Sequence, residues 1–155
     1  MNIGFTIGKF APLHLGHDQL IQKGIQENDL FYILINDTDV TDISLEVRAN
    51  WLKELYPDAN ILLGTNTPKR YGMDPESIQI QTDYLKKMFH GIPVTRFYSG
   101  EKYGEYVADA FGIENVFVPK EIDISATKIR NNPEKYQKYL KIQVYNDYIN
   151  KKRSL

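Results

Sequence analysis

Cysteine is absent from the 155 residues of this sequence, which excludes disulfides, thiolate zinc sites and cysteine nucleophiles. Because a chain without cysteine suits a reducing compartment, we expect a cytoplasmic protein. Neither sign of charge is in excess, since 19 Lys and Arg against 20 Asp and Glu leave a formal net charge of -1. That balance argues against a surface that binds long nucleic acids, because such a surface needs an excess of positive charge.

Long apolar runs are missing too. The first residues, MNIGFTIGKF, lack the basic region and the long apolar stretch of a signal peptide, and no segment approaches the length of a membrane span. We therefore expect neither a nucleic-acid partner nor a membrane partner, whereas small anionic ligands fit the composition. The oligomeric state stays open, a homo-oligomer included.

Short apolar runs of the kind found in buried strands alternate with segments of helical periodicity. The strand-like runs are residues 3–7, 30–35, 61–63, 94–98 and 115–118, and the helical segments are 16–28, 44–55, 75–89 and 101–111. This alternation predicts one α/β domain over residues 1–155, a doubly wound Rossmann-like parallel sheet, with a C-terminal helical segment at about 133–152. Ligands of such sheets bind outside the carboxyl ends of the strands, where the polar loops of this chain also lie.

The stretch GKFAPLHLGH, Gly8 to His17, joins the first strand to the first helix. Gly8 lets the backbone turn and Gly16 opens the helix, whose free N–H groups favour a phosphate. Lys9 adds a full charge, and His14 and His17 are one helical turn apart, so both imidazoles can point at a bound anion. Two alternatives stand beside this one: ordinary solvated histidines, or imidazoles that share a metal ion. The second ranks lower because no further His, Cys or paired carboxylate is nearby.

A second stretch, ISATKIR, lies at Ile124 to Arg130. Ser125 or Thr127 is suited to begin a short helix whose N–H groups face a phosphate, and Arg130 supplies a planar, permanently charged fork for phosphate oxygens. Taken alone, this segment reads equally as a capped surface helix with a solvated arginine.

Together the two stretches resemble the GxFxPxHxGH and ISxTxxR signatures of the nucleotidylyltransferases. The flanking segments SLEVRANWLKELYPD (residues 44–58) and SATKIRNNPEKYQKYL (residues 125–140) are similar to the nicotinamide-mononucleotide adenylyltransferase domain of the bacterial NadR-type proteins. The resemblance covers nearly the whole chain. It implies the nucleotidylyltransferase fold and the transfer of AMP from ATP to nicotinamide mononucleotide, by direct in-line attack, to give NAD and pyrophosphate. It also implies Mg²⁺ carried mainly by the ATP phosphates, with no protein metal ligands assigned.

The resemblance further implies the roles of individual residues. His14 and His17 would contact the ATP phosphates and the transition state, and Lys9 and Arg130 would be further catalytic residues. The implied ATP site also includes Gly8, Phe10, Gly16, Ser99, Gly100, Ser125 and Thr127.

On the acceptor side, the resemblance makes Arg48 a candidate for the phosphate of the mononucleotide, with a salt-bridged helix arginine as the alternative. Asn36 and Tyr71 complete the expected acceptor site. Trp51 could stack on a base, but its spacing with the apolar residues of its helix favours a core position.

The loop after the third strand departs from the family. NadR-like domains carry tryptophans there, whereas TNTPKRYGMDPES has none, so Tyr71 would stack on the nicotinamide instead. Two alternatives follow: an adenylyltransferase for another phosphorylated acceptor, and a non-catalytic sensor of adenine nucleotides or NAD. Neither a helix-turn-helix nor a GxxxxGK[ST] loop is present in the sequence, so we expect no DNA binding and no riboside phosphorylation.

Overall fold

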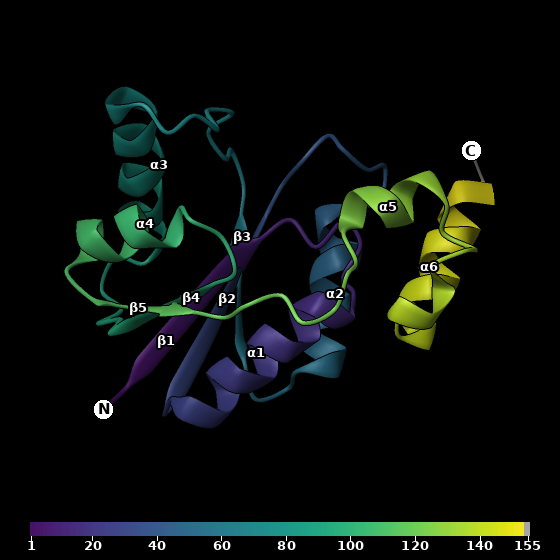
Figure 1. Ribbon diagram of the computed structural model, residues 1–155, viewed down its shortest axis with the longest axis horizontal. Helices are drawn as coiled ribbons and strands as arrows, with labels where there is room; N and C mark the ends of the chain where they lie inside the picture. Colours follow the sequence, from purple (N-terminus) through teal and green to yellow (C-terminus); the bar gives the residue numbers. More distant parts are fainter. Residues whose placement is uncertain (154–155) are drawn as a thin grey trace.

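The computed structural model describes residues 1–153 and contains a five-stranded parallel sheet with helices on both faces (Figure 1). The strands are β1 Ile3–Gly8, β2 Leu30–Asn36, β3 Asn60–Gly64, β4 Arg96–Ser99 and β5 Glu114–Phe117. Their order in the sheet is β3-β2-β1-β4-β5, and every pair is parallel. The predicted doubly wound Rossmann-like fold is therefore confirmed. The chain reverses its direction of winding between β1 and β4, the position where sheets of this kind bind ligands.

The helices divide the core into two halves, one on each face of the sheet. Helices α1 (Leu15–Glu27), α2 (Leu45–Leu55), α5 (Ala126–Asn131) and α6 (Ile142–Arg153) contribute to one apolar cluster, and α3 (Pro75–Met88) and α4 (Gly104–Phe111) to the other. Along β2, Ile33 and Ile35 belong to the first cluster and Leu34 to the second, as the two-residue period of a strand requires. Burial on both faces explains why the strands are nearly continuous apolar runs.

Helix ends follow the local signals of the sequence. The Ser44 hydroxyl accepts a hydrogen bond from the Val47 N–H at 3.2 Å and caps α2, since serine is a favoured N-cap residue. Asp74 caps α3 in the same way, and Gly112 ends α4 in a left-handed conformation, with φ 67°.

The C-terminal segment differs from the prediction of a helical stretch starting near residue 133. Pro133 follows the end of α5, and the chain then forms turns and a short 3₁₀-helix, Gln137–Tyr139, before α6 begins at Ile142. Helix α6 packs Val144 and Tyr148 into the first cluster. The Trp51 indole N–H donates to the Asp147 carboxylate at 2.8 Å. Trp51 is 1% exposed, which confirms its core position and leaves no face for stacking on a ligand.

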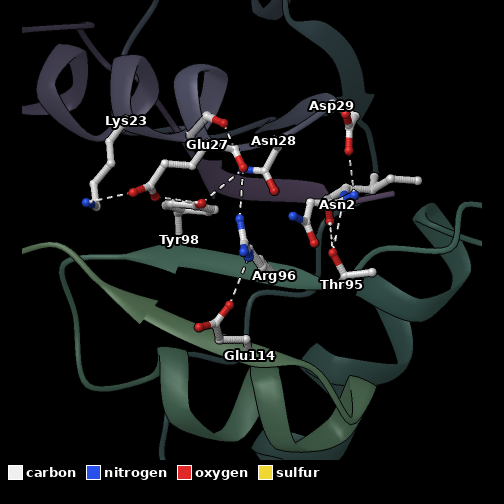
Figure 2. A network of polar contacts seen from close by, with 11 residues as sticks. Asn2, Lys23, Glu27, Asn28, Asp29, Thr95, Arg96, Tyr98 and Glu114 are labelled. Atoms are coloured by element: carbon white, nitrogen blue, oxygen red, sulfur yellow. Dashed lines mark hydrogen bonds and ion pairs between the residues drawn. The ribbon is translucent and has the colours of Figure 1, made fainter.

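Polar contacts fix the C-terminal end of helix α1 to the sheet (Figure 2). The Tyr98 hydroxyl donates to the Glu27 carboxylate at 2.9 Å and accepts from the Asn28 amide at 2.9 Å. The Arg96 guanidinium donates to the Glu27 carbonyl at 2.8 Å and to the Glu114 carboxylate at 2.9 Å. Helix α1 is thus held by Arg96 and Tyr98 of β4 at one end, and its other end carries the two histidines. Within residues 1–153, no helix combines the length and the apolar composition needed to cross a membrane.

Candidate functional site

Two cavities adjoin at the carboxyl ends of the central strands. The first, of about 270 Å³, lies under the loops that follow β1, β4 and β5, and we call it the histidine cavity because His14 and His17 line it. The second, of about 640 Å³, lies between the loop of residues 65–74 and helices α3 and α4. We call it the tyrosine cavity because four tyrosines line it: Tyr71, Tyr84, Tyr103 and Tyr106. Four residues line both cavities: Ile7, Gly8, Glu101 and Tyr103.

The two histidines form one rigid unit at the start of α1. Their rings stack with centroids 3.7 Å apart and planes inclined by 25°. His14 is the N-cap of the helix, and its Nδ1 accepts from the Gly16 N–H at 3.1 Å. His17 Nδ1 accepts from the His14 N–H at 3.1 Å. Each bond uses a backbone donor that the helix start leaves free, so the histidines cap the helix reciprocally.

Those two bonds decide the tautomer of each ring. Because each Nδ1 accepts from a backbone N–H, the ring proton lies on Nε2. Burial, together with the smaller effect of the nearby charge of Lys120, lowers the pKa of His14 to about 4. The pKa of His17 is also well below its ordinary value because of burial, then His14, then Lys120. Both imidazoles are therefore neutral at pH 7, and each offers one Nε2–H donor to the cavity.

The residues around the pair hold its geometry. A Cβ on Gly16 would lie 2.9 Å from the His14 ring, so only glycine leaves room for this stacking. Phe10 takes a left-handed backbone with φ 48°, and its buried ring meets the His17 ring edge-on at 4.9 Å. Gly8, Phe10 and Gly16 all line the histidine cavity, where the sequence places them.

The ISATKIR segment closes the same cavity from the other side. The Ser125 hydroxyl accepts from the Lys128 N–H at 3.2 Å and caps α5, and Ser125 lines the histidine cavity. Arg130 donates to the Ala11 carbonyl at 2.8 Å and to the Thr127 hydroxyl at 3.3 Å. Arg130 thus joins the two motifs directly. Among the described residues, however, neither Arg130 nor Thr127 lines the cavity, so their roles as phosphate ligands stay predictions.

Ser99 and Gly100 lie where the prediction places them, at the end of β4 and beside the histidine cavity. The Ser99 hydroxyl accepts from the Glu101 N–H at 2.9 Å and fixes the loop that follows. A Cβ on Gly100 would lie 3.0 Å from the Val118 carbonyl, so the glycine permits close approach of the loops after β4 and β5.

Lys9 lies on the other side of the crevice from the position we expected. It lines the tyrosine cavity rather than the histidine cavity, and its ammonium lies 4.8 Å from the centroid of the Tyr71 ring. Tyr71 is 67% exposed, so one aromatic face remains open at the rim of the cavity. The charge of Lys9 is therefore available to the tyrosine cavity, whereas the role of Lys9 in catalysis stays a prediction.

Arg48 contradicts both expectations for it, the acceptor phosphate and the salt bridge. It is 1% exposed, and its guanidinium donates to three carbonyls: Lys9 at 2.5 Å, Asn36 at 3.1 Å and Ile43 at 3.1 Å. The bonds fasten the loops after β1 and β2 to α2. Burial lowers the pKa of Arg48, although an arginine stays charged over the physiological range. Arg48 thus supports the backbone beneath the crevice.

Asn36 ends β2 and lines the tyrosine cavity, and its role in an acceptor site stays a prediction. Its side-chain oxygen accepts from the Thr67 hydroxyl at 3.4 Å. The Asp37 carboxylate accepts from the Asn66 and Thr67 N–H groups at 2.8 and 3.2 Å. These bonds attach the loop of residues 65–74 to the end of β2.

The sequence reasoning missed Lys120, Glu101 and three of the four cavity tyrosines. Lys120 and Glu101 form an ion pair with 2.8 Å between nitrogen and oxygen. Lys120 lies in the loop after β5, and a charged residue two positions after the end of a predicted strand was the signal that could have found it. Tyr84, Tyr103 and Tyr106 lie in or next to α3 and α4, where a helical pattern alone does not distinguish cavity from core. Burial raises the pKa of Tyr103 to about 12, so its hydroxyl stays protonated.

Within residues 1–153, no three His, Cys, Asp or Glu side chains gather closely enough to hold a metal ion. Both Nδ1 atoms of the stacked histidines are also occupied by backbone donors. The arrangement therefore gives no support to the alternative in which the two imidazoles share a metal.

No protein-family model matches the chain. It is 30% identical over 166 residues to the trifunctional NAD biosynthesis/regulator protein NadR of Salmonella typhimurium, and 29% identical over 162 residues to NadR of Escherichia coli. These matches cover 92% of this chain, which spans about 40% of the length of either relative.

Solved structures show the same relationship. A NadR protein in complex with NAD and AMP-PNP matches with a TM-score of 0.66 and 26% identity, over 89% of this chain and 44% of that one. A bifunctional NMN adenylyltransferase/ADP ribose pyrophosphatase from Francisella tularensis has the same fold, with a TM-score of 0.59 and 17% identity over 99% of this chain and 53% of that one. With both signature motifs meeting at one crevice, these similarities support a relationship of the chain to the nucleotidylyltransferase superfamily, with NadR among its relatives.

Proposed function

We propose that the chain transfers AMP from ATP to nicotinamide mononucleotide and releases NAD and pyrophosphate. One observation carries the proposal: two cavities meet over Gly8 at the carboxyl end of β1, and the smaller is lined by two neutral histidines whose Nε2–H groups have no hydrogen-bond partner among the described residues. A reaction between two nucleotides needs two adjoining sites with donors beside the reacting phosphorus.

The histidine cavity suits the phosphates of ATP. In the proposed step, an oxygen of the mononucleotide phosphate forms a bond to the α-phosphorus, and the bond from that phosphorus to the bridging oxygen of pyrophosphate breaks. Negative charge builds on the non-bridging oxygens and on the leaving group. His14 and His17 would donate to these oxygens, and because they are neutral, they do so without a change of protonation. The residues present supply donors rather than a nucleophile, in agreement with direct transfer.

The tyrosine cavity suits the mononucleotide. Tyr71 offers an open aromatic face for the pyridine ring, and Lys9 and Arg70 offer positive charge for its phosphate. The NadR structures in complex with NAD and AMP-PNP, and with NR, show that relatives at about 25% identity take these ligands. They support nucleotide substrates for this chain too.

Magnesium fits the site as an ion carried by the triphosphate. Glu101 is the one carboxylate among the described residues that line the two cavities, so the protein offers little direct ligation. When bound to phosphate oxygens and water, Mg²⁺ would offset the charge of the triphosphate.

A panel of acceptors tests the proposal. The protein, ATP and Mg²⁺ are incubated with nicotinamide mononucleotide, nicotinate mononucleotide or an unrelated phosphorylated acceptor, and released pyrophosphate is measured. We expect nicotinamide mononucleotide to give the highest kcat/KM. The altered loop of residues 65–74 favours a second candidate, another phosphorylated acceptor, and a higher kcat/KM with that acceptor would replace our proposal. Tight ATP binding without pyrophosphate release on any acceptor would show a sensor instead.

A further inference from the structure

An ion pair spans the histidine cavity. Glu101 lies in the loop after β4 and Lys120 in the loop after β5, both line the cavity, and their side chains approach to 2.8 Å. The two side chains are 62% exposed for Lys120 and 54% exposed for Glu101, so solvent reaches the pair from outside. Neither residue belongs to the GKFAPLHLGH or ISATKIR stretch.

This pair supplies the full charges among the described residues that line the histidine cavity. Among the described residues that line it, Lys120 carries the one full positive charge and Glu101 the one negative charge. The two histidines are neutral. The cations expected at the phosphates are engaged elsewhere, because Lys9 lies against Tyr71 in the other cavity and Arg130 donates to the Ala11 carbonyl. A triphosphate in the cavity would therefore meet one cation, and that cation is already paired with a carboxylate.

The pair is suited to exchange its partner. An ion pair this exposed adds little to the stability of a protein, so breaking it costs little. A phosphate oxygen is a strong acceptor for an ammonium group, and the lysine stem is long and flexible. Lys120 lines the same cavity as His14 and His17, and its charge lowers the pKa of both histidines.

We propose that Lys120 is a ligand of the ATP phosphates and that Glu101 is the counter-ion from which it separates when ATP binds. This inference rests on the proposed function, since it assumes that the histidine cavity takes the triphosphate. It predicts that Lys120 discriminates between nucleotides by the length of their phosphate chain.

Calorimetric titration of the full chain with ATP and with AMP, both with Mg²⁺, tests the inference. Lys120→Met should weaken ATP binding about tenfold, the scale of one charge-assisted hydrogen bond at a half-exposed position, and leave AMP binding within about twofold. Glu101→Gln should bind ATP at least as tightly as the wild type, because the competing carboxylate is gone. Lys120→Arg keeps the charge and should retain most of the affinity for ATP.

The matched control is Lys128→Met, which removes a lysine that pairs with Asp123 at 3.1 Å outside both cavities. It should bind ATP like the wild type. One outcome is that the wild type forms NAD while Lys120→Met binds ATP as tightly as the wild type does. In that case the inference on Lys120 is wrong and the proposed function stands. A wild type that binds neither nucleotide would overturn both.

Discussion

The neutral state of His14 has a measurable consequence for stability. Its pKa is about 4 in the folded protein against 6.5 for the unfolded chain. The unfolded chain therefore binds more protons between these values, so the stabilising contribution is present above pH 6.5 and is lost as the pH falls toward 4. The full difference corresponds to about 3 kcal/mol, of which about 2 kcal/mol is lost between pH 7.5 and pH 5.0. His17 adds to the loss in the same direction because its pKa is also lowered.

Urea unfolding at pH 7.5 and pH 5.0 measures the effect. His14→Asn removes the titrating group but keeps a side-chain oxygen that can accept from the Gly16 N–H, since asparagine is a favoured N-cap. We expect the variant to lose about 2 kcal/mol less than the wild type on acidification. His90→Asn, which changes an exposed histidine outside both cavities, is the control and should keep the wild-type difference. If His14→Asn lost as much stability as the wild type between pH 7.5 and pH 5.0, the interpretation of His14 as a neutral histidine that caps the helix would be refuted.

Three further predictions concern other positions. Arg48→Lys should lower the free energy of unfolding by about 2 kcal/mol, because an ammonium cannot reach the carbonyls that the guanidinium joins; an unchanged urea midpoint would contradict this. Trp51→Phe should cost about 2 kcal/mol through the lost bond to Asp147 and the space left behind, and equal stability of the variant and the wild type would show that α6 is not anchored there. Tyr71→Ala should raise the KM for the acceptor about tenfold with little change in the KM for ATP, whereas Tyr71→Phe keeps the ring and the wild-type values. An acceptor KM of the alanine variant equal to that of the wild type would remove Tyr71 from the acceptor site.

Alternation of apolar runs and helical segments was enough to predict the sheet, because strands buried on both faces leave a strong pattern. The break before α6 was not predicted. Residues 133–141 have a composition that fits a helix, and only the turn after Pro133 and the packing of Val144 and Tyr148 show where the last helix begins.

The site was predicted only in part, because residue spacing is visible in the sequence whereas contacts with the backbone are not. Spacing placed His14 and His17 at a helix start, but stacking and a shared cap depend on backbone groups that a sequence does not display. Arg48 was misassigned because its three acceptors are carbonyls, which every residue has. Lys120 was overlooked because its importance arises from the loop after β4, which brings Glu101 against it.

The most direct test of the account is NAD formation by the wild type and by His17→Asn. In this variant the asparagine oxygen can accept from the His14 N–H in place of Nδ1, but the Nε2–H donor is lost. With ATP, Mg²⁺ and nicotinamide mononucleotide, we predict NAD and pyrophosphate in equal amounts from the wild type. We predict a turnover roughly a hundredfold lower from the variant, the scale of one lost transition-state donor. Absence of NAD from the wild type, or equal turnover by the two proteins, would contradict the central claim.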